Sequence, residues 1–362
     1  MEESEESIPS EKAPVVAAIL VSWNSLGYLP ASLRSLSEQT LPPDDIVLVD
    51  NGSTDGSQAW VRENYPAVRL FENGRNLGFC RANNQGISLA NAEYILLVNT
   101  DVVLEPDFVR TLVEAMRSDS GLGSASGKLL CGSPQEDEDE DGDGVRTIDS
   151  AGEVIYNTRR CVNRGEGEVD SGRYDAREEV FGVTAAAALY RASMLEDVRI
   201  GEDYFDVDYF AYMEDSDLNW RAQLRGWRCL YEPAAVGYHV RQHATSRNLS
   251  IRRHAAVNRY LTLWKNETLA NLLLGLPSLV PYEGFRALKL LFREPELLPG
   301  FAKLVRLLPR TLRKRHLIQS RRRVSSGYIR SWTIPEDYRG EFRRRLRKRP
   351  QVTEDAVSAG VR

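Results

Sequence analysis

The chain has 362 residues and a formal net charge of −5; 42% of the residues are hydrophobic and 27% are charged. This ordinary composition suffices for one large domain with an appendage. No run of 18 or more apolar residues occurs, which excludes a membrane-spanning helix. The acidic, polar start does not resemble a signal peptide, and the four cysteines lack the paired spacings of a zinc site. We therefore expect a cytoplasmic protein with reduced, mostly buried thiols.

Strand and helix patterns alternate over the first hundred residues. Apolar, β-branched runs predict strands at residues 15–21, 45–50, 68–72 and 94–98. Helices are predicted from Leu29 onward, at 57–64 and at 80–90. This alternation indicates βαβ units and a mostly parallel sheet, in which ligands bind beyond the carboxyl ends of the strands. The polar segments at those ends are residues 22–24, 50–55, 74–76 and 99–101.

The middle and the end of the chain are less regular. Residues 135–144 form a low-complexity acidic run that predicts a disordered, solvated loop; calcium binding is the weaker alternative, because nothing there closes a ligand geometry. Residues 214–226 suit a helix, and residues 234–238 suit an apolar strand. Beyond residue 261, leucine-rich stretches alternate with basic residues and prolines and predict short amphipathic helices.

The turn DNGSTDG, residues 50–56, directly follows a predicted strand. A carboxylate at a strand end, here Asp50, can accept a hydrogen bond from the imide N–H of a uracil or thymine ring. Gly52 and Gly56 allow the backbone to approach a ligand closely. The alternative interpretation is a polar turn that only caps the next helix.

Asn99, Thr100 and Asp101 follow the fourth predicted strand. A carboxylate here can reach a Mg²⁺ or Mn²⁺ ion that bridges two phosphates, since such an ion needs only one or two protein carboxylates. An Asx turn is the alternative, and it is the commoner origin of a short Asn/Asp pair.

Three carboxylates, those of Glu214, Asp215 and Asp217, begin the helix predicted at 214–226. They suit the positive end of the helix dipole, and Asp215 could be a simple N-cap. The functional interpretation is a general base that removes the proton of an acceptor hydroxyl. Capping and catalysis are compatible here.

His239 ends the strand predicted at 234–238. A histidine at that point can supply a nitrogen ligand to the same metal. A lone histidine is more often a packing or surface residue, and His243, four residues later, competes for the role.

The order of these features along the chain is similar to that of a known family. The matching segments are VSWNSLGYLPASLRSLSEQT, DIVLVDNGSTDGS, NLGFCRANNQGI, YILLVNTDV and FDVDYFAYMEDSDLNWRAQLRGWRCLYEPAAVGYH. With these segments the chain resembles family 2 glycosyltransferases, closest to the bacterial rhamnosyltransferase-like branch, over about residues 15–265. The resemblance implies the α/β GT-A fold, a Rossmann-like, mostly parallel sheet flanked by helices.

The same resemblance implies roles for individual residues. Asp50 matches the residue that binds the base, and Ser22, Asn24 and Asn51 surround that pocket. The residues matching the rest of the nucleotide and diphosphate site are Arg75, Asn76, Asn99 and Thr100.

The family's metal and catalytic positions fall on four further residues. Asp101 and His239 match the metal ligands, Asp215 matches the catalytic base, and Glu214 beside it shapes the acceptor site. Asn99 stands where the strict Asp-x-Asp motif has an aspartate, so we expect a metal affinity that depends more on the donor's own phosphates.

The function implied is an inverting, Mg²⁺- or Mn²⁺-dependent transfer of a sugar from a nucleotide diphosphate to a hydroxyl of a lipid-linked or cell-surface glycan. By resemblance the first candidate donor is dTDP-rhamnose and the second a UDP-hexose. A sugar nucleotidyltransferase is a rival, but no Gly-rich, basic triphosphate loop follows the first strand. A non-catalytic sugar-nucleotide-binding protein is disfavoured by the joint presence of the four functional positions Asp50, Asp101, Asp215 and His239.

The carboxyl end is strongly basic, with 17 Lys and Arg against three Asp and Glu between residues 301 and 350. Recognisable nucleic-acid-binding modules are missing, so we expect a solvated helical surface or peripheral contact with an anionic membrane at the inner face of the cell membrane. The predicted domains are a disordered acidic N-terminus (1–13), the GT-A domain (14–265), an amphipathic basic helical extension (266–350) and a flexible tail (351–362).

Overall fold

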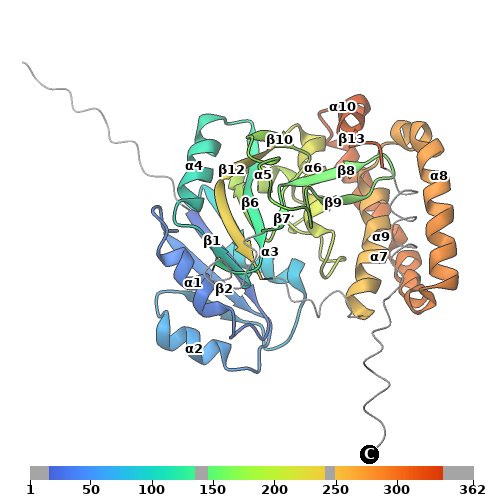
Figure 1. Cartoon of the computed structure of the whole chain (residues 1–362). Helices are drawn as coiled ribbons and strands as arrows, with labels where there is room; N and C mark the ends of the chain where they lie inside the picture. Colours follow the sequence, from blue (N-terminus) through green and yellow to red (C-terminus); the bar gives the residue numbers. More distant parts are fainter. Residues whose placement is uncertain (1–15, 135–145, 241–248, 337–362) are drawn as a thin grey trace, which may run out of the picture.

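The computed structural model describes residues 16–134, 146–240 and 249–336 (Figure 1). The expectations for the acidic N-terminus, the acidic run 135–144, His243 and the chain beyond residue 336 lie outside these ranges. Within them the chain builds one large mixed sheet with helices on both faces, and a group of further helices at one side (Figure 1).

The large sheet has ten strands, ordered β10-β12-β6-β11-β4-β1-β2-β3, with β5 paired to β12 and β7 paired to β6. The strands of its amino-terminal half are β1 (Val16–Ser22), β2 (Asp45–Asp50), β3 (Arg69–Glu72), β4 (Tyr94–Val98) and β5 (Val102–Leu104). The other strands are β6 (Leu122–Cys131), β7 (Ile148–Ser150), β10 (Glu178–Val180), β11 (Ala187–Arg191) and β12 (Arg228–His239). A separate three-stranded sheet contains β8 (Glu153–Tyr156), β9 (Cys161–Asn163) and β13 (Thr333–Ile334).

The chain reverses its direction of travel across the sheet at β1. Strands β2 and β3 lie on one side of β1 and β4 lies on the other, all four being parallel. Strand β12 also runs in the direction of β4, because β11 is antiparallel to both β4 and β6 and β12 is parallel to β6. The carboxyl ends of β1, β2, β4 and β12 therefore share one edge, which is where ligands bind in such sheets.

Helices cover both faces of the large sheet and bury two apolar cores. On one face Leu33 of α1 (Leu29–Ser37) and Leu112 of α4 (Phe108–Ser118) pack on the sheet. On the other face Ile87 of α3 (Phe79–Leu89) and Leu218 of α6 (Glu214–Arg225) do the same. Strand β4 is buried along its whole length, as expected for a strand covered on both sides.

The remaining helices are α2 (Ser57–Asn64), α5 (Ala192–Val198), α7 (Leu249–Asn266), α8 (Leu269–Phe292), η3 (Pro295–Phe301), α9 (Ala302–Ser320) and α10 (Ser326–Ser331). The prediction of short helices beyond residue 261 was wrong, because α8 has 24 residues and α9 has 19. Prolines 277, 281 and 309 lie inside these helices without ending them. A proline removes one backbone donor, and here the surrounding leucines, alanines and basic residues favour the helix strongly enough to continue.

Strand β12 is also longer than the predicted 234–238. It begins at Arg228, and its pairing with β6 shifts register between Glu232 and Val236. Pro233 lies in that irregularity, where a strand tolerates a residue that cannot donate to the ladder. The strand still ends at His239, as predicted.

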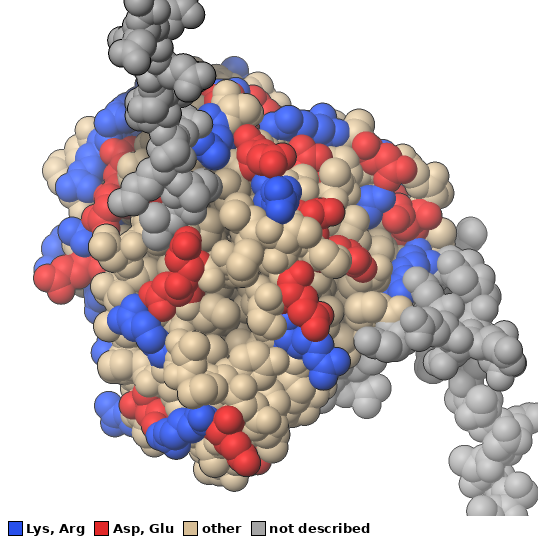
Figure 2. All heavy atoms as spheres, turned by 90° about the vertical axis from the view of Figure 1, so that its left-hand side faces the viewer, with Lys and Arg blue, Asp and Glu red and all other residues tan. Residues whose placement is uncertain are grey.

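Charges of both signs alternate on the side of the molecule that carries α1, α2 and α4 (Figure 2). The exposed ion pairs Arg62–Glu72 and Arg69–Asp45 lie on β3, α2 and the start of β2. Among the described residues on this face, neither sign gathers into a continuous patch.

The side of the molecule that carries α8 differs from this one. Helix α8 is the outermost element in Figure 1 and exposes many leucines. None of the described helices is both long and apolar enough to cross a bilayer.

Candidate functional site

The turn after β2 is held together by Asp50. Its carboxylate is fully buried and accepts hydrogen bonds from the backbone N–H groups of Gly52 (3.0 Å) and Ser53 (3.0 Å). The Gln58 amide (2.8 Å) and the Ser53 hydroxyl also donate to it. The structure thus gives Asp50 a defined task, which is to shape the turn. Its contact with a base stays a prediction.

The loop after β1 is joined to this turn. Ser22 lies opposite Asp50 in the register of β1 and β2, and its carbonyl accepts a hydrogen bond from the N–H of Asn51 (2.7 Å). Asn24 is exposed, with a positive φ of 53°, and its side-chain oxygen accepts the N–H of Thr54 (2.8 Å). The structure therefore brings the predicted residues Ser22, Asn24, Asp50 and Asn51 into one cluster.

Gly52 lets a third segment join the cluster. It has φ +78°, and a Cβ on it would lie 2.6 Å from the backbone nitrogen of Arg75. The segment with Arg75 and Asn76 can therefore reach the turn only because residue 52 has no side chain. Both side chains are exposed, and the Asn76 side chain accepts the N–H of Gly78 (2.9 Å).

The residues after β4 face the end of β12. Val102 of β5 pairs with His239, which brings Asp101 next to the histidine at a distance of 3.4 Å between Oδ1 and Nε2. Asn99 is half-buried and Thr100 is buried, and the backbone carbonyl of Asn99 accepts the N–H of Val102 (3.1 Å), which closes an ordinary backbone turn rather than an Asx turn. The two predicted metal ligands, 138 positions apart in the sequence, thus converge.

Asp149, which the sequence did not single out, fixes the ring of His239. Its Oδ2 lies 2.9 Å from His239 Nδ1, and the carboxylate is buried. Burial alone would lower the pKa of His239, but the hydrogen bonds and charges of Asp101 and Asp149 outweigh it and raise the pKa to about 9. A carboxylate behind a histidine is the usual device that orients a metal-binding imidazole.

These two groups fit a divalent cation with few protein ligands. Asp101 offers a half-exposed carboxylate, and Asp149 directs the Nε2 of His239 toward it. Within the described ranges no group of three or more His, Cys, Asp or Glu side chains forms a metal site. The remaining positions of such an ion would fall to phosphate oxygens and waters, as is common for Mg²⁺.

Helix α6 presents its carboxylates at its first turn. Its N-cap is Met213, with φ +70°, so the prediction of Asp215 as N-cap was wrong. Asp215 instead lies inside the first turn, where its Oδ1 accepts the N–H of Ser216 (2.8 Å). Glu214 is buried whereas Asp215 is half-exposed, which leaves Asp215 as the accessible carboxylate of the pair.

Glu153, a second residue that the sequence did not indicate, joins this group. It is buried at the start of β8 and accepts hydrogen bonds from the Ser216 hydroxyl and from the Asn219 amide (2.9 Å). Burial, and then the charge of Asp215, raise the pKa of both Glu153 and Glu214 to about 8. At neutral pH these two carboxyls are protonated, and shifts of this kind cluster at functional sites.

Protein stability is expected to fall as pH rises toward 8. The folded chain keeps the protons of Glu153 and Glu214 up to about pH 8, whereas the unfolded chain releases them near the ordinary value of 4.5. Their contribution is therefore full below pH 4.5 and is lost as pH rises through 8. Glu153→Gln removes one such proton and should flatten the slope between these values by about 1.4 kcal/mol per pH unit. Urea unfolding across pH measures the slope; an unchanged slope, or the same change in the exposed control Glu202→Gln, would contradict the assignment.

A five-residue segment, 149–153, connects the two parts of the site. Its first residue, Asp149, contacts His239, and its last, Glu153, contacts Ser216 next to Asp215. The N–H of Glu153 donates to the carbonyl of Gly182 (2.8 Å), which anchors the segment. The metal-type pair and the α6 carboxylates are thus held by one short stretch of chain.

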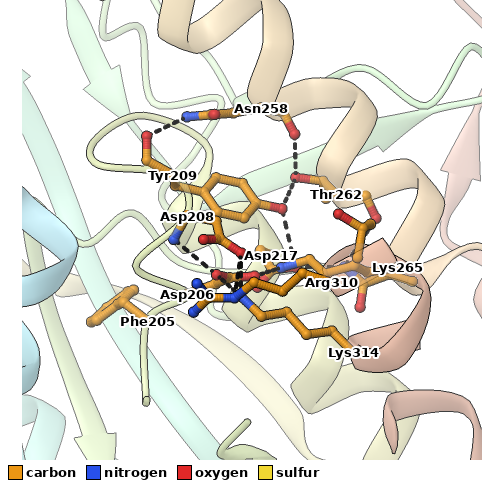
Figure 3. A network of polar contacts seen from close by, with 12 residues as sticks. Phe205, Asp206, Asp208, Tyr209, Asp217, Asn258, Thr262, Lys265, Arg310 and Lys314 are labelled. Atoms are coloured by element: carbon orange, nitrogen blue, oxygen red, sulfur yellow. Dashed lines mark hydrogen bonds and ion pairs between the residues drawn. The ribbon is translucent and has the colours of Figure 1, made fainter. Parts of the chain in front are cut away.

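The loop before α6 has an unusual backbone. Phe210, Tyr212 and Met213 all have positive φ angles near 70°, a conformation that side-chain-bearing residues rarely adopt. Asn258 of α7 is fully buried, and its amide donates to the carbonyl of Tyr209 (3.0 Å; Figure 3) and to those of Ala211 (2.9 Å) and Tyr212 (2.8 Å). Strained backbone near functional groups persists when surrounding contacts over-determine it, as this amide does.

Replacing Asn258 by aspartate is expected to loosen this loop. The carboxylate has the same shape but would face three carbonyl oxygens with no hydrogen to donate. We expect a loss of about 1–3 kcal/mol of unfolding free energy, together with faster hydrogen exchange of the amides in residues 209–213. Asn91→Asp, on an exposed loop, is the matched control. Unchanged exchange in the loop would show that Asn258 does not hold it.

A buried ion network supports the same loop from below (Figure 3). The Asp206 carboxylate pairs with Lys265 of α7 and Lys314 of α9, and Lys265 also lies 2.9 Å from Asp217 of α6. Burial alone would raise the pKa of Asp206, but the charges of Lys265 and Lys314 hold it well below its usual range. Helices α7 and α9 are therefore tied to the loop and the helix that carry Asp215.

The sequence of the chain is similar to those of known proteins. The model of the family described as Glycosyl transferase family 2 matches residues 17–199, a range that ends before Asp215 and His239. The chain is 28% identical over 253 residues to an N-acetylglucosaminyl-diphospho-decaprenol L-rhamnosyltransferase from Mycobacterium tuberculosis, covering 65% of this chain and 78% of the relative. It is 24% identical over 224 residues to a poly-beta-1,6-N-acetyl-D-glucosamine synthase from Staphylococcus aureus, covering 61% of this chain and 48% of that relative.

The fold has counterparts among solved structures. A crystal structure of GalNAc-T7 with UDP, GalNAc and Mn²⁺ superposes with a TM-score of 0.50 at 15% sequence identity. The superposition covers 68% of this chain and 48% of that chain. At this identity the likeness concerns the fold, which is GT-A: a mostly parallel mixed sheet flanked by helices, here with a helical carboxyl-terminal region.

Proposed function

The chain belongs to glycosyl transferase family 2, and from this premise we propose an inverting transfer of a sugar from a nucleotide diphosphate to a glycan hydroxyl. One observation carries the proposal. Asp101 and His239 converge at the sheet edge that also holds the turn of Asp50, and the segment 149–153 joins this pair to Asp215. A nucleotide diphosphate and an acceptor hydroxyl would need their binding groups in this order along one edge.

Asp215 acts in this scheme as the general base. It takes the proton of the acceptor hydroxyl while the acceptor oxygen forms a bond to the anomeric carbon of the sugar. The bond from that carbon to the diphosphate oxygen breaks on the opposite side, so the configuration inverts and the nucleoside diphosphate leaves. Because Glu153 and Glu214 keep their protons at neutral pH, Asp215 can stay ionised without two neighbouring negative charges.

Asp101 and His239 would hold a divalent cation, Mg²⁺ or Mn²⁺. When bound, such an ion neutralises negative charge on the departing diphosphate. Asn99 stands beside this pair and adds no charge, so the donor's phosphates would contribute more of the binding. The protein's own contribution is geometric, since Asp149 holds the imidazole ring of His239 in place.

The donor nucleotide would occupy the cluster around the turn after β2. We place the base near Asp50, Asn51, Ser22 and Asn24, and the ribose and diphosphate near the backbone of the Arg75–Asn76 segment and near Asn99 and Thr100. The first candidate donor is dTDP-rhamnose, which the rhamnosyltransferase relative supports. A UDP-hexose is the second, supported by the UDP-bound structure of the same fold and by the synthase relative.

The acceptor is proposed to be a lipid-linked or cell-surface glycan, which brings the protein to the inner face of a membrane. The outer face of α8 supports this contact, since Leu274, Val280 and Phe292 are 63%, 62% and 79% exposed. Contiguous exposed apolar faces mark interaction surfaces, and amphipathic helices with basic flanks bind anionic interfaces. Failure to sediment with anionic vesicles at low salt would contradict the contact.

The experiment that tests the proposal is a nucleotide screen by thermal stabilisation. The protein is mixed with dTDP, UDP, GDP or their sugars, with Mg²⁺ or Mn²⁺ or with a chelator. We expect dTDP or UDP to raise the melting temperature only with the cation, and Asp101→Asn to abolish this cation-dependent shift. The exposed control Asp107→Asn should keep the shift. No shift with any nucleotide would contradict the proposed donor site.

A further inference from the structure

A cavity of about 650 Å³ lies between α7 and α8, away from the donor cluster. Its size falls in the range of small-molecule sites. Residues of α7 form one wall and residues 282–293 form the other. The cavity also reaches Met213, the residue directly before Glu214 and Asp215, and Cys161 of β9.

The charge of the lining is mostly positive. Six basic residues and two acidic ones line the cavity, the acidic ones being Glu294 and Glu336. Glu294 is shared between Arg252 (2.9 Å) and Lys289 (3.1 Å). Arg293 has no ion pair with any residue in the described part of the chain. Glu336 pairs with Arg160 (2.8 Å), and two carboxylates beside the lining, Glu283 and Glu296, pair with Arg259 (2.7 Å) and Arg252 (3.2 Å). Six basic residues thus share four carboxylates, and the positive charge left over suits an anionic ligand.

One buried Nε of the lining, that of Arg160, is paired with Glu336 (2.8 Å), whereas two other buried nitrogens of the lining make no hydrogen bond. They are the Nε atoms of Arg259 and Arg286. The nearest carboxylate to the latter, that of Glu283, lies 3.7 Å away, beyond hydrogen-bond length. Buried donors are normally satisfied, so two unsatisfied guanidinium nitrogens in one cavity indicate an acceptor-rich ligand.

The rest of the wall is apolar and continues to the surface. Phe285, Leu288, Leu290 and Phe292 contribute to it. Leu288 and Phe292 are 56% and 79% exposed, so the apolar wall passes into the exposed face of α8. A ligand with a charged head and a long hydrocarbon chain could enter here from a membrane surface. Its chain would stay in contact with apolar side chains along the whole route.

The inner end of the cavity approaches the carboxylates of α6. Burial raises the pKa of the Cys161 thiol, and the charges of Glu153 and Asp215 contribute to the shift, which places this lining residue near both. Met213 is the N-cap of the helix that carries Asp215. The inner end of the cavity therefore lies at the start of the helix that carries the proposed general base.

We propose that this cavity binds the diphosphate and the first part of the hydrocarbon chain of a lipid-linked acceptor. The proposal rests on the glycosyl transfer proposed above. The arginines and Lys289 hold the diphosphate, the wall of α8 takes the chain, and the glycan hydroxyl extends toward Asp215. The surface leucines of α8 lie in the membrane from which the lipid comes.

The test is a titration of the protein with farnesyl diphosphate, a short lipid diphosphate, in which calorimetry measures binding. The nucleotide that gives the shift in the screen is present at saturation with Mg²⁺, so that the donor site is occupied. Inorganic diphosphate and farnesol serve as the head alone and the chain alone. The variant Lys289→Glu/Arg293→Glu changes two exposed residues of the rim, and Arg306→Glu/Arg313→Glu makes the same charge change on exposed residues of α9.

We expect farnesyl diphosphate to bind the natural protein and the α9 variant alike, and the rim variant at least about tenfold more weakly. Inorganic diphosphate alone and farnesol alone should each bind more weakly than farnesyl diphosphate. Equal binding by inorganic diphosphate, equal affinity of the rim variant, or no binding would each overturn the inference. The nucleotide screen separates the two proposals. If a nucleotide raises the melting temperature but farnesyl diphosphate does not bind, only the cavity's role as a lipid diphosphate site is contradicted. If no nucleotide raises the melting temperature, the proposed function itself is contradicted.

Discussion

The Asp215→Asn protein is expected to lose glycosyl transfer by a factor of about 10²–10⁴ while keeping its fold and its nucleotide site. Asparagine retains the oxygen that accepts the N–H of Ser216, so the first turn of α6 remains capped. It cannot take the proton of the acceptor hydroxyl. Single-turnover rates with a nucleotide-sugar donor measure the loss, and thermal shifts with the nucleotide measure donor binding in the same protein.

Two comparisons make this result specific. Glu63→Gln removes a carboxylate from the exposed face of α2 and should leave the rate unchanged. Glu214→Gln mimics the protonated state that the raised pKa of Glu214 already imposes at neutral pH, so a smaller effect is expected there. A normal rate in Asp215→Asn would show that another group removes the proton. Loss of nucleotide binding together with the rate would show a structural defect.

Lys265→Met is expected to lower the unfolding free energy by about 3–5 kcal/mol at neutral pH. Lys265 is buried between Asp206 and Asp217, and its ammonium also lies 4.4 Å from the ring centroid of Tyr209. Methionine keeps the packing volume but leaves two buried carboxylates with less compensation. Urea unfolding measures the change, and Lys289→Met on the exposed part of α8 is the control, expected within about 0.5 kcal/mol.

The pH dependence of this loss provides a second criterion. In the natural protein the pKa of Asp206 lies below its ordinary value of 3.8, so its contribution to stability is full above that value and is lost as pH falls below it. In Lys265→Met, protonation of the same carboxylate stabilises the folded protein already at a higher pH. The difference between the two proteins should therefore shrink as pH falls toward 4. A constant difference would assign the loss to packing rather than to charge.

Elements of the first hundred residues could be predicted from the sequence to within one or two residues. Strand β4 and helix α2 have the bounds that local patterns indicated, because a run such as YILLV is buried on both faces and a turn such as NGSTDG ends a strand unambiguously. The carboxyl-terminal helices were predicted as too short, because prolines within α8 and α9 were given more weight than the helix-forming residues around them.

The candidate site was predicted in part, and its missing members share one property. Asp101, Asp215 and His239 end or begin regular elements, so their positions could be read from strand and helix patterns. Asp149 and Glu153 belong to short strands in an irregular region, and nothing local distinguished them from the other 50 acidic residues of the chain. What marks them is contact with residues more than 60 positions away, and such contacts exist only in the folded chain.

The same property explains why the role of α7 and α9 was not predicted. Asp206 pairs with lysines 59 and 108 positions later, and Asn258 reaches carbonyls 46 to 49 positions earlier. The basic character of the carboxyl end suggested a solvated or membrane-facing surface. Part of that charge lies inside the molecule instead, since Lys314 is buried and pairs with Asp206.

The buried pairing of Asp206 with Lys265 and Lys314 limits how such an enzyme can be altered or can evolve. Exchanging the carboxyl-terminal helices for those of a relative, in order to change acceptor preference, would exchange the counter-charges of the loop before α6 at the same time. A chimaera would need to carry residues 205–217 along with α7 and α9, so the junction has to lie before residue 205, as at the end of the matched family region, and not between α6 and α7. Acceptor range in this protein should therefore change more readily through substitutions within the α8 wall than through exchange of whole segments.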